Sequence, residues 1–305
     1  MSFNFDIKNY FRPILFQLRY IFYKQIKYRN YIPCIKTLEE TLQDIIENNL
    51  SISRFGDGEL SIMCGGSIGF CRKDKKLEQR LKDIPINPIE KHMICLPPML
   101  QSMAGLTKRS RKYWRNLLAT EYPIWIHYFG GREHYGNAFI SRFYMDYQNI
   151  ATADSIIKLW KNLWKDRNIL IVEGVNTRMG MGNNLFDNAK SISRILCPPQ
   201  DAYEQYDCII EAVKRHYDGQ LIIIGLGPTA TVLAYDLSKL GFQALDIGHI
   251  DIEYEWYLRK ATKKVNILNK AVNEYKAGGL NVTANISDDY KDQIVENITI
   301  VSNIK

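Results

Sequence analysis

Three stretches of this chain share one pattern: a short apolar run, a loop that contains glycine, and a segment with helical spacing. The apolar runs are residues 51–55, 169–172 and 221–224. A strand followed by a loop and a helix is the repeating unit of a parallel sheet with helices on its faces. We therefore expect an α/β fold with a Rossmann-like parallel sheet and flanking helices.

Helix and strand boundaries follow from local signals. Residues 38–48 have helical periodicity, and residues 230–240 are the clearest helix because Gly241 stands where a left-handed C-cap belongs. Residues 242–247 are predicted as the next strand. The 305 residues contain no internal repeat. We expect one domain over residues 36–305, preceded by an extension over residues 1–35.

The composition restricts location and partners only broadly. The net charge of +7 suits anionic partners without choosing among them. The six cysteines are scattered, with no C-x-x-C pair, which favours free thiols in a reducing compartment. No secretory signal is evident at the N-terminus. We expect a cytoplasmic protein, with a place at the inner face of the cell membrane if the extension binds there.

The extension is predicted as a basic amphipathic helix. Its helically spaced apolar residues are Phe11, Leu15, Leu18, Phe22 and Ile26, and its basic residues include Arg12, Arg19, Lys24 and Lys27. The basic residues argue against a helix that spans the bilayer. Such a helix could bind an anionic membrane surface or a partner, or it could pack on its own domain.

The first candidate site is the segment Ser-Arg-Phe-Gly-Asp-Gly-Glu at residues 53–59. Asp57 and Glu59 offer the hard oxygen ligands that Mg²⁺ or Mn²⁺ prefers, and such an ion offsets charge on a departing nucleoside diphosphate. Gly56 lets the backbone approach a ligand, and Arg54 could contact phosphate. The alternative is an ordinary turn, because Asp and Gly are common in turns.

The second candidate site is the glycine turn after the apolar run at 221–224. It contains Gly225, Gly227, Pro228 and Thr229, and a helix start there favours a diphosphate. The turn also satisfies the dinucleotide fingerprint, with Asp246 at the right distance for a ribose hydroxyl. An NAD(P)-dependent oxidoreductase is therefore an alternative, although it leaves the first pair of carboxylates without a role. A turn without a ligand is a further alternative.

The third candidate site is the acidic segment at residues 246–256. If the segment is helical, Asp251 and Glu255 share a face; if it is extended, His249 and Glu253 join them. A general base for an acceptor hydroxyl is expected here, from Asp251 or Glu255 with help from His249. The alternative is a solvated acidic helix start.

A glycine-rich loop and two basic runs complete the candidates. The loop follows the run at 169–172 and carries Arg178, which could bind phosphate. The basic runs at 72–76 and 108–115, the second with Tyr113 and Trp114, are typical of solvated helix faces. We expect no nucleic-acid partner.

Together these segments resemble a bacterial glycosyltransferase family with the GT-D fold, which builds glycans on adhesins and other cell-surface polymers. Residues 51–59 are similar to the family's D-x-E metal motif. Residues 227–230 and 246–256 are similar to its C-terminal signature, and the loop with Arg178 and residues 184–186 also fits. The resemblance extends over about residues 36–295.

The resemblance implies a UDP-sugar donor, most often UDP-glucose, a Mn²⁺ or Mg²⁺ ion, and a glycan, glycoprotein or lipid-linked acceptor. It assigns Asp57 and Glu59 to the metal and the diphosphate. The pattern departs at Cys71, where the family implies glutamine, so the choice of sugar is expected to depend on that position. The alternatives are the NAD(P)-dependent oxidoreductase and a catalytically inactive nucleotide-binding scaffold.

Overall fold

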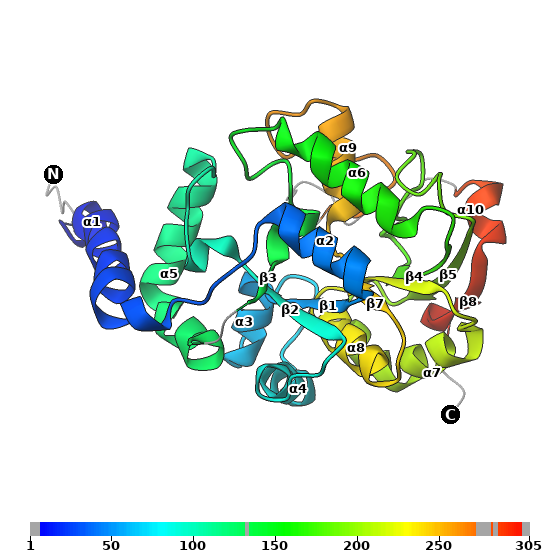
Figure 1. Cartoon of the computed structure of the whole chain (residues 1–305), viewed down its shortest axis with the longest axis horizontal. Helices are drawn as coiled ribbons and strands as arrows, with labels where there is room; N and C mark the ends of the chain where they lie inside the picture. The colour runs from blue at the N-terminus through cyan, green and yellow to red at the C-terminus, as the bar shows by residue number, and fades with distance from the viewer. Residues whose placement is uncertain (1–6, 132–133, 273–281, 283–285, 301–305) are drawn as a thin grey trace, which may run out of the picture.

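Among the residues that the structure describes, eight parallel strands form one sheet at the centre of the molecule (Figure 1). The computed structural model describes residues 7–131, 134–272, 282 and 286–300, with the side chains of 7–13 and 300 outside the description. The strands are β1 (Ser51–Arg54), β2 (His92–Leu96), β3 (Gly136–Asn137), β4 (Asn168–Gly174), β5 (Ser191–Cys197), β6 (Leu221–Gly225), β7 (Ala244–Asp246) and β8 (Ile294–Asn297). Their order is β3-β2-β1-β7-β6-β4-β5-β8, and each neighbouring pair is parallel. The predicted α/β class is confirmed.

Helices cover both faces of the sheet (Figure 1). One face carries α3 (Asp57–Met63), α4 (Lys75–Ile86), α7 (Tyr206–His216) and α8 (Pro228–Lys239), and the other carries α2 (Leu38–Asn48), α6 (Thr152–Trp164) and α9 (Ile250–Leu258). At the two ends of the sheet lie α5 (Lys108–Phe129) and α10 (Asp288–Asp292). Short 3₁₀ turns are η3 (Pro98–Leu100), η4 (Ala138–Ser141), η5 (Ala202–Gln205) and η6 (Ile298–Ile300).

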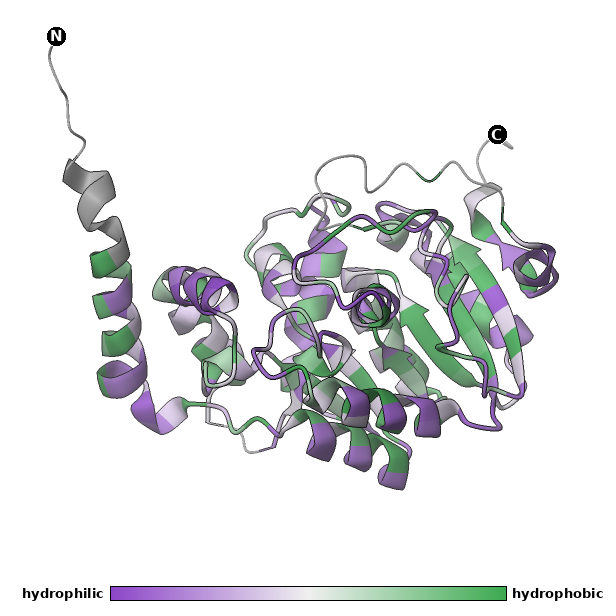
Figure 2. Ribbon diagram, turned by 90° about the horizontal axis from the view of Figure 1, so that it is seen from above, coloured by the Kyte–Doolittle hydropathy of each residue, from purple (hydrophilic) through white to green (hydrophobic). Residues whose placement is uncertain are grey.

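The central strands β4 and β6 each contain a continuous apolar run, and Figure 2 shows such hydrophobic stretches within the sheet. Each residue from 169 to 172 in β4 and from 221 to 224 in β6 is fully buried. A strand covered by helices on both faces needs such a continuous apolar run, and a fully buried isoleucine contributes about 1.5–3 kcal/mol. This is why these runs are the most reliable strand signals in the sequence.

Several predicted elements coincide with the structure. The helix predicted at 38–48 is α2, where Thr37 and Glu40 exchange capping hydrogen bonds at 3.1 and 2.8 Å. The strand predicted at 51–55 is β1, and Gly241 has the left-handed φ of 82° expected after α8. The strand predicted at 242–247 is shorter, because β7 begins only at Ala244.

The N-terminal extension forms α1 (Ile7–Ile21), followed by η1 (Phe22–Lys27) and η2 (Arg29–Tyr31). The segment packs against α5: the rings of Tyr20 and Tyr28 lie 6.3 and 6.1 Å from that of Tyr122, and Lys24 donates to the backbone oxygen of Gln101 at 2.5 Å. The predicted apolar positions Leu15, Leu18, Phe22 and Ile26, with Ile14, are exposed instead; we call these five residues the α1 stripe.

The extension therefore packs on its own domain, which is one of the predicted arrangements, and leaves the α1 stripe exposed. Tyrosines attach it to its own domain, while the α1 stripe faces away, with exposures from 46% at Phe22 to 66% at Ile26. The side chains of Phe11 and Arg12 lie outside the described residues. In the described part of the chain, no helix is both long enough and apolar enough to cross a bilayer.

Glu253 on α9 holds the segment that follows η4. It is fully buried, and its Oε2 accepts the N–H groups of Tyr144 and Met145 at 3.1 and 2.9 Å. Its Oε1 accepts no hydrogen bond from the described residues. Burial, and to a lesser degree the nearby Asp146, raise the pKa of Glu253 to about 7.

This shift predicts a pH-dependent loss of stability. The folded pKa of about 7 lies above the ordinary value of 4.5, so the folded protein keeps a proton that the unfolded chain releases. Stability from this group is complete below about pH 4.5 and is lost as the pH rises through 7. From about pH 5 to about pH 8, wild type should lose on the order of 2–3 kcal/mol relative to Glu253→Gln, which cannot titrate.

Urea unfolding of both proteins across this pH range measures the difference. Glu47→Gln, at an exposed position on α2, is the matched control and should follow wild type. Parallel pH profiles for wild type and Glu253→Gln would contradict the buried-carboxyl interpretation.

Candidate active site

The carboxyl ends of the strands open into a cavity of about 720 Å³. Residues 54–59 after β1 and 198–202 after β5 line it, together with the first residues after β4, β6 and β7. Parallel α/β sheets bind ligands outside these strand ends. The volume lies within the roughly 300–1,000 Å³ range of small-ligand sites.

Asp57 and Glu59 both line this cavity, from the first turn of α3 rather than from an open loop. The Glu59 carboxylate turns back and accepts the N–H of Gly56 at 2.7 Å, which caps the helix. Asp57 accepts a hydrogen bond from the phenol of Tyr113 on α5. Burial, followed by the negative charge of Asp246, raises the pKa of Glu59 to about 7. The predicted pair therefore lies together at the cavity wall.

Arg54 lines the cavity, but its guanidinium is directed at protein groups. It pairs with Asp246 at 2.9 Å, donates from Nε to the Asp246 backbone oxygen at 2.7 Å, and donates from Nη1 to Ser141 at 2.7 Å. Asp246 is buried, and its other oxygen accepts from the Arg54 N–H and the Thr231 hydroxyl. Asp246 does not line the cavity. This geometry argues against its predicted ribose contact, because both carboxylate oxygens already accept hydrogen bonds.

The glycine turn lies where the sequence predicts, between β6 and α8. Gly225, Gly227 and the buried Thr229 line the cavity, whereas Pro228 occupies the first helical position and does not. Gly227 has a φ of 54°, and a Cβ there would overlap the ring of Phe70, another cavity-lining residue. The backbone at the start of α8 therefore faces the ligand space, as an anion site requires.

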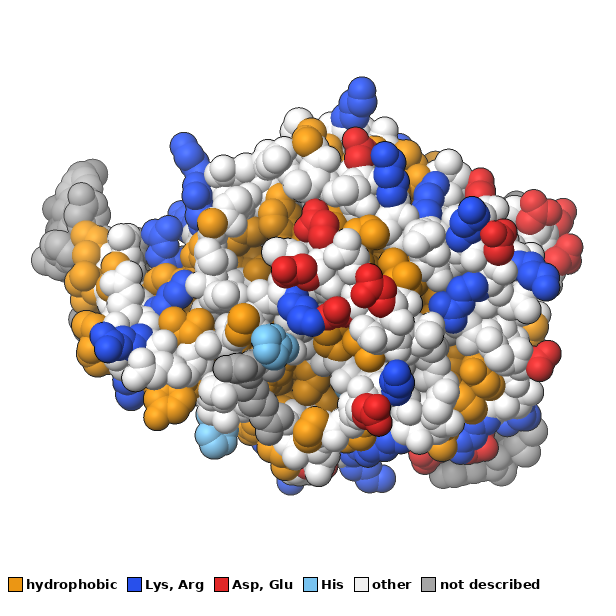
Figure 3. Space-filling model, viewed as in Figure 1, with side chains coloured by type: hydrophobic (Ala, Val, Ile, Leu, Met, Phe, Trp, Pro, Cys, Tyr) orange, Lys and Arg blue, Asp and Glu red, His pale blue; other side chains and the backbone are white. Residues whose placement is uncertain are grey.

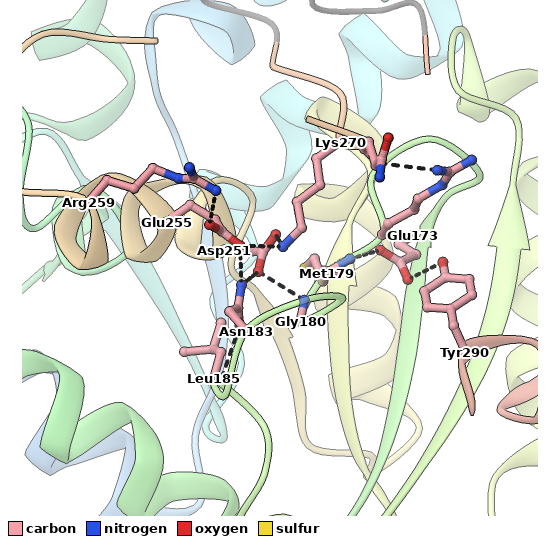
Figure 4. A network of polar contacts seen from close by, with 12 residues as sticks. Glu173, Met179, Gly180, Asn183, Leu185, Asp251, Glu255, Arg259, Lys270 and Tyr290 are labelled. Atoms are coloured by element: carbon pink, nitrogen blue, oxygen red, sulfur yellow. Dashed lines mark hydrogen bonds and ion pairs between the residues drawn. The ribbon is translucent and has the colours of Figure 1, made fainter. Parts of the chain in front are cut away.

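Asp251 and Glu255 share one face of α9, which is the helical alternative for this segment (Figure 4). Both are buried and accept hydrogen bonds from Lys270 at 2.7 and 3.1 Å, and neither lines the cavity. Burial alone would raise the pKa of Glu255, but Asn183 and two cations hold it below its ordinary value. A general base must reach the acceptor hydroxyl, so this placement argues against that role for both. Of the three predicted residues, His249 alone lines the cavity.

Arg178 lies behind the cavity wall rather than in it. Its side chain is buried, and Nη1 donates to the backbone oxygen of Asn269 at 3.2 Å. It is absent from the cavity lining, which argues against the predicted phosphate contact. An arginine in a glycine-rich loop suggested a contact with a ligand. In the structure, Arg178 instead holds this loop in place through its hydrogen bond to Asn269.

The cavity also contains cationic and aromatic side chains that the sequence interpretation did not assign to ligands. They are Arg109, Tyr113 and Trp114 from the start of α5, Arg142 after η4, and Lys263 and Lys264 after α9. The sequence signal was the basic and aromatic run at 108–115, which is equally typical of a solvated helix face. Only the fold shows that the first turns of α5 border the site.

Asp57 and Glu59 fit a cation that shares its ligands with phosphate. Among the described residues, no group of three or more His, Cys, Asp or Glu side chains is arranged to hold a metal ion alone. Mg²⁺ is commonly bound through one or two carboxylates, with phosphate and water completing the shell. The donor set is therefore suited to a metal that accompanies a phosphorylated ligand.

A model of the glycosyltransferase GT-D fold matches residues 52–275, which include both carboxylates, the glycine turn and α9. The chain belongs to this GT-D glycosyltransferase family. The fold that defines this family is a glycosyltransferase fold. The alternative of a dinucleotide-dependent oxidoreductase relied mainly on a ribose contact by Asp246. That carboxylate instead accepts hydrogen bonds from the Arg54 N–H and the Thr231 hydroxyl within the GT-D domain.

Two streptococcal proteins are similar in sequence to this GT-D chain. It is 36% identical over 267 residues to a probable glycosyl transferase Gly of Streptococcus gordonii, covering 87% of this chain and 39% of that protein. It is 37% identical over 242 residues to the glycosyltransferase GlyD of Streptococcus pneumoniae serotype 4, covering 79% and 30%. The chain therefore spans well under half the length of either relative.

Solved structures agree with the GT-D assignment. The highly conserved domain of unknown function 1792, described as having a distinct glycosyltransferase fold, superposes with a TM-score of 0.84 at 34% identity, covering 94% of this chain and 99% of that one. A glycosyltransferase of the same domain type from Streptococcus sanguinis gives 0.81 at 36% identity, covering 87% and 98%.

Gly227→Ala should damage the site as well as the backbone. A left-handed backbone at a residue with a side chain costs of the order of 1–3 kcal/mol, and here the new Cβ must also displace Phe70 from the cavity wall. We expect lower thermal stability, and binding of a nucleoside diphosphate probe such as UDP should weaken by about tenfold or more relative to wild type. Gly241→Ala is the matched control, because its φ is 82° with open space around the Cβ. Normal UDP affinity in a folded Gly227→Ala protein would show that the turn is only structural.

Proposed function

We propose that this GT-D chain transfers a sugar from a UDP-sugar, with UDP-glucose as the first candidate, to a glycan in cell-surface polysaccharide or glycoprotein synthesis. One observation carries the proposal: the carboxylates at the start of α3 and the glycine turn at the start of α8 open onto the same cavity. Helix-start N–H groups suit a diphosphate, and carboxylates suit the cation that accompanies it. A site with both features suits a nucleoside diphosphate sugar.

The proposed metal site consists of Asp57 and Glu59, for Mn²⁺ or Mg²⁺. When bound, the ion would offset the negative charge of the departing UDP. Burial and the charge of Asp57 raise the pKa of Tyr113, so its phenol stays protonated and orients the Asp57 carboxylate. The raised pKa of Glu59 means that a neighbouring cation would favour its ionised form.

We propose that other cations take the phosphate role that the sequence assigned to Arg54 and Arg178. The candidates are the cavity-lining cations Arg109, Arg142, Lys263 and Lys264. Arg54 instead forms an ion pair with Asp246, which joins the ends of β1 and β7 next to the cavity. This division is supported by burial, since the Arg54 side chain is 13% exposed and its partner 3%.

Fewer residues can be proposed for the acceptor and for the choice of sugar. Of the predicted acid–base group, His249 lines the cavity, so we keep it as the candidate that assists deprotonation of the acceptor hydroxyl. Cys71, where the family resemblance implies glutamine, is buried and lines the same cavity. We propose that sugar selection depends on this position.

Calorimetry with UDP-glucose and Mn²⁺, compared with NADH, tests the donor class directly. Asp57→Asn should reduce metal-dependent UDP binding and donor hydrolysis on the order of 100-fold, because the ion loses a charged ligand. Asp288→Asn is the matched control, since Asp288 also begins a helix but is exposed on α10.

Two results would contradict this assignment. If Asp57→Asn keeps wild-type activity that EDTA still abolishes, the metal lies elsewhere. If wild type binds NADH and not UDP-glucose, the donor class is wrong. Binding of UDP-glucose without its hydrolysis or transfer to any acceptor would favour the inactive scaffold over the transferase.

We also propose that the α1 stripe binds an anionic membrane surface. The chain from residue 7 to 31 contains six basic residues and no acidic one, and the exposed stripe provides the apolar contact. Figure 3 shows hydrophobic side chains along the end of the molecule formed by α1. Apolar insertion combined with basic charge is typical of helices that lie on anionic bilayers.

Leu18→Ser with Ile26→Ser should weaken sedimentation with anionic vesicles at low salt by about tenfold, because two half-exposed apolar side chains no longer insert. Leu240→Ser with Leu258→Ser is the matched control, since these leucines are exposed outside the stripe. Equal binding by both double variants would contradict the membrane contact. A wild-type dimer that the stripe variant converts to a monomer, without vesicle binding, would make the stripe a contact between copies.

A further inference from the structure

The segment that follows α9 forms part of the cavity wall without belonging to a helix or a strand. We call residues 259–272 the strap. Thr262, Lys263, Lys264 and Ala271 of the strap line the cavity. A wall without a strand ladder depends on side-chain and loop contacts for its position. Those contacts therefore decide where Lys263 and Lys264 stand relative to a ligand.

Three consecutive strap residues are joined to other parts of the domain. On one side, the backbone oxygen of Asn269 accepts from Arg178 at 3.2 Å. On the other, the N–H of Ala271 donates to the backbone oxygen of Asn176 at 2.8 Å. Arg178 and Asn176 both belong to the glycine-rich loop after β4, and Asn176 also lines the cavity. The strap and this loop are thus two walls of one site, fastened to each other.

Lys270 lies between these two contacts and fastens both walls to α9 (Figure 4). Its side chain is 2% exposed, and Nζ donates to Asp251 at 2.7 Å and to Glu255 at 3.1 Å. From the loop, Asn183 donates to the same two carboxylates at 2.8 Å, and the N–H of Gly180 donates to Asp251 at 2.9 Å. The two buried carboxylates therefore accept hydrogen bonds from both the strap and the glycine-rich loop.

The backbone on both sides of this network is held in an unusual conformation. Arg178 and Asn269, which are hydrogen-bonded to each other, have φ values of 52° and 68°. Asparagine adopts this left-handed region readily, but an arginine avoids it unless its surroundings impose it. The network of Lys270, Asp251 and Glu255 provides such surroundings.

We propose that Lys270 is a positioning residue for donor binding. By fixing the strap to α9 and to the glycine-rich loop, it places Lys263 and Lys264 where they contact the phosphates of the nucleotide. Asp251 and Glu255 act through Lys270 and need not touch the substrate. This inference rests on the proposed function, because it assumes that the cavity binds a nucleoside diphosphate.

Lys270→Met tests the inference. UDP binding with Mn²⁺ should weaken roughly 10- to 100-fold, as for other residues that orient ligand contacts. Binding of uridine, which has no phosphate, should change by less than about threefold, because the displaced lysines do not contact it. A merely structural role would not separate UDP from uridine.

A second variant guards against misfolding, since Lys270→Met leaves two buried carboxylates without their cation. Lys270→Met with Asp251→Asn removes one negative charge and keeps a side-chain oxygen for Gly180. It should fold and show the same selective loss of UDP binding. Arg80→Met is the matched control, because Arg80 pairs with Asp236 at 2.6 Å and neither residue lines the cavity. It should lower stability without changing UDP affinity.

The outcomes separate this inference from the proposed function. If wild type does not bind UDP, the proposed function fails and the inference with it. If wild type binds UDP and a folded Lys270 variant binds it equally well, the inference alone is overturned. Equal losses of UDP and uridine binding would also overturn it, because they would indicate general damage to the cavity.

Discussion

The ion pair between Arg54 and Asp246 joins the two halves of the sheet at their weakest point. Backbone pairing between β1 and β7 consists of a single register pair, Ile52 with Leu245. Side chains complete the junction. The Ser51 hydroxyl donates to the backbone oxygen of Phe242, just before β7, and accepts the N–H of Ala244 at its start. The Arg54 guanidinium binds both the side chain and the backbone oxygen of Asp246. A pair this deeply buried stabilises only when its remaining hydrogen bonds are satisfied, as they are here.

The same junction also determines where the cavity-lining residues after β1 and β7 lie. Because Arg54 ends β1 and Asp246 ends β7, fixing them sets the directions in which the chain leaves both strands. After β1 the chain turns directly into α3, which presents Asp57 to the cavity. After β7 it passes Gly248, where a Cβ would overlap the Arg54 guanidinium, and reaches His249. Arg54 and Asp246 were predicted to contact the ligand; instead they position the neighbouring segments that line the cavity. Gly248 lets these two chain segments approach each other.

Sequence patterns predicted features that depend on neighbouring residues. They did not predict the roles of residues whose contacts are distant in the sequence. The buried runs in β4 and β6, the α2 helix and the Gly241 cap depend on neighbouring residues, so spacing alone identified them. Asp57 and Glu59, which were selected by residue type, line the cavity. The roles of Asp246, Arg178 and Asp251 depend on partners that lie 192, 91 and 19 residues away. No pattern in the sequence shows whether a charged residue faces a ligand or another charge.

The distribution of charge within the cavity bears on how a donor would bind under the proposed function. Asp57 and Glu59 repel a free diphosphate, whereas Arg109, Arg142, Lys263 and Lys264 attract it. A divalent cation removes the repulsion on one side only, so the carboxylates and the cations serve different parts of one anion. The raised pKa of Glu59 sharpens the distinction, because near neutral pH its carboxylate gains full charge only when a cation is close. A site of this composition should therefore bind UDP weakly without metal, even though four basic side chains besides Arg54 line it.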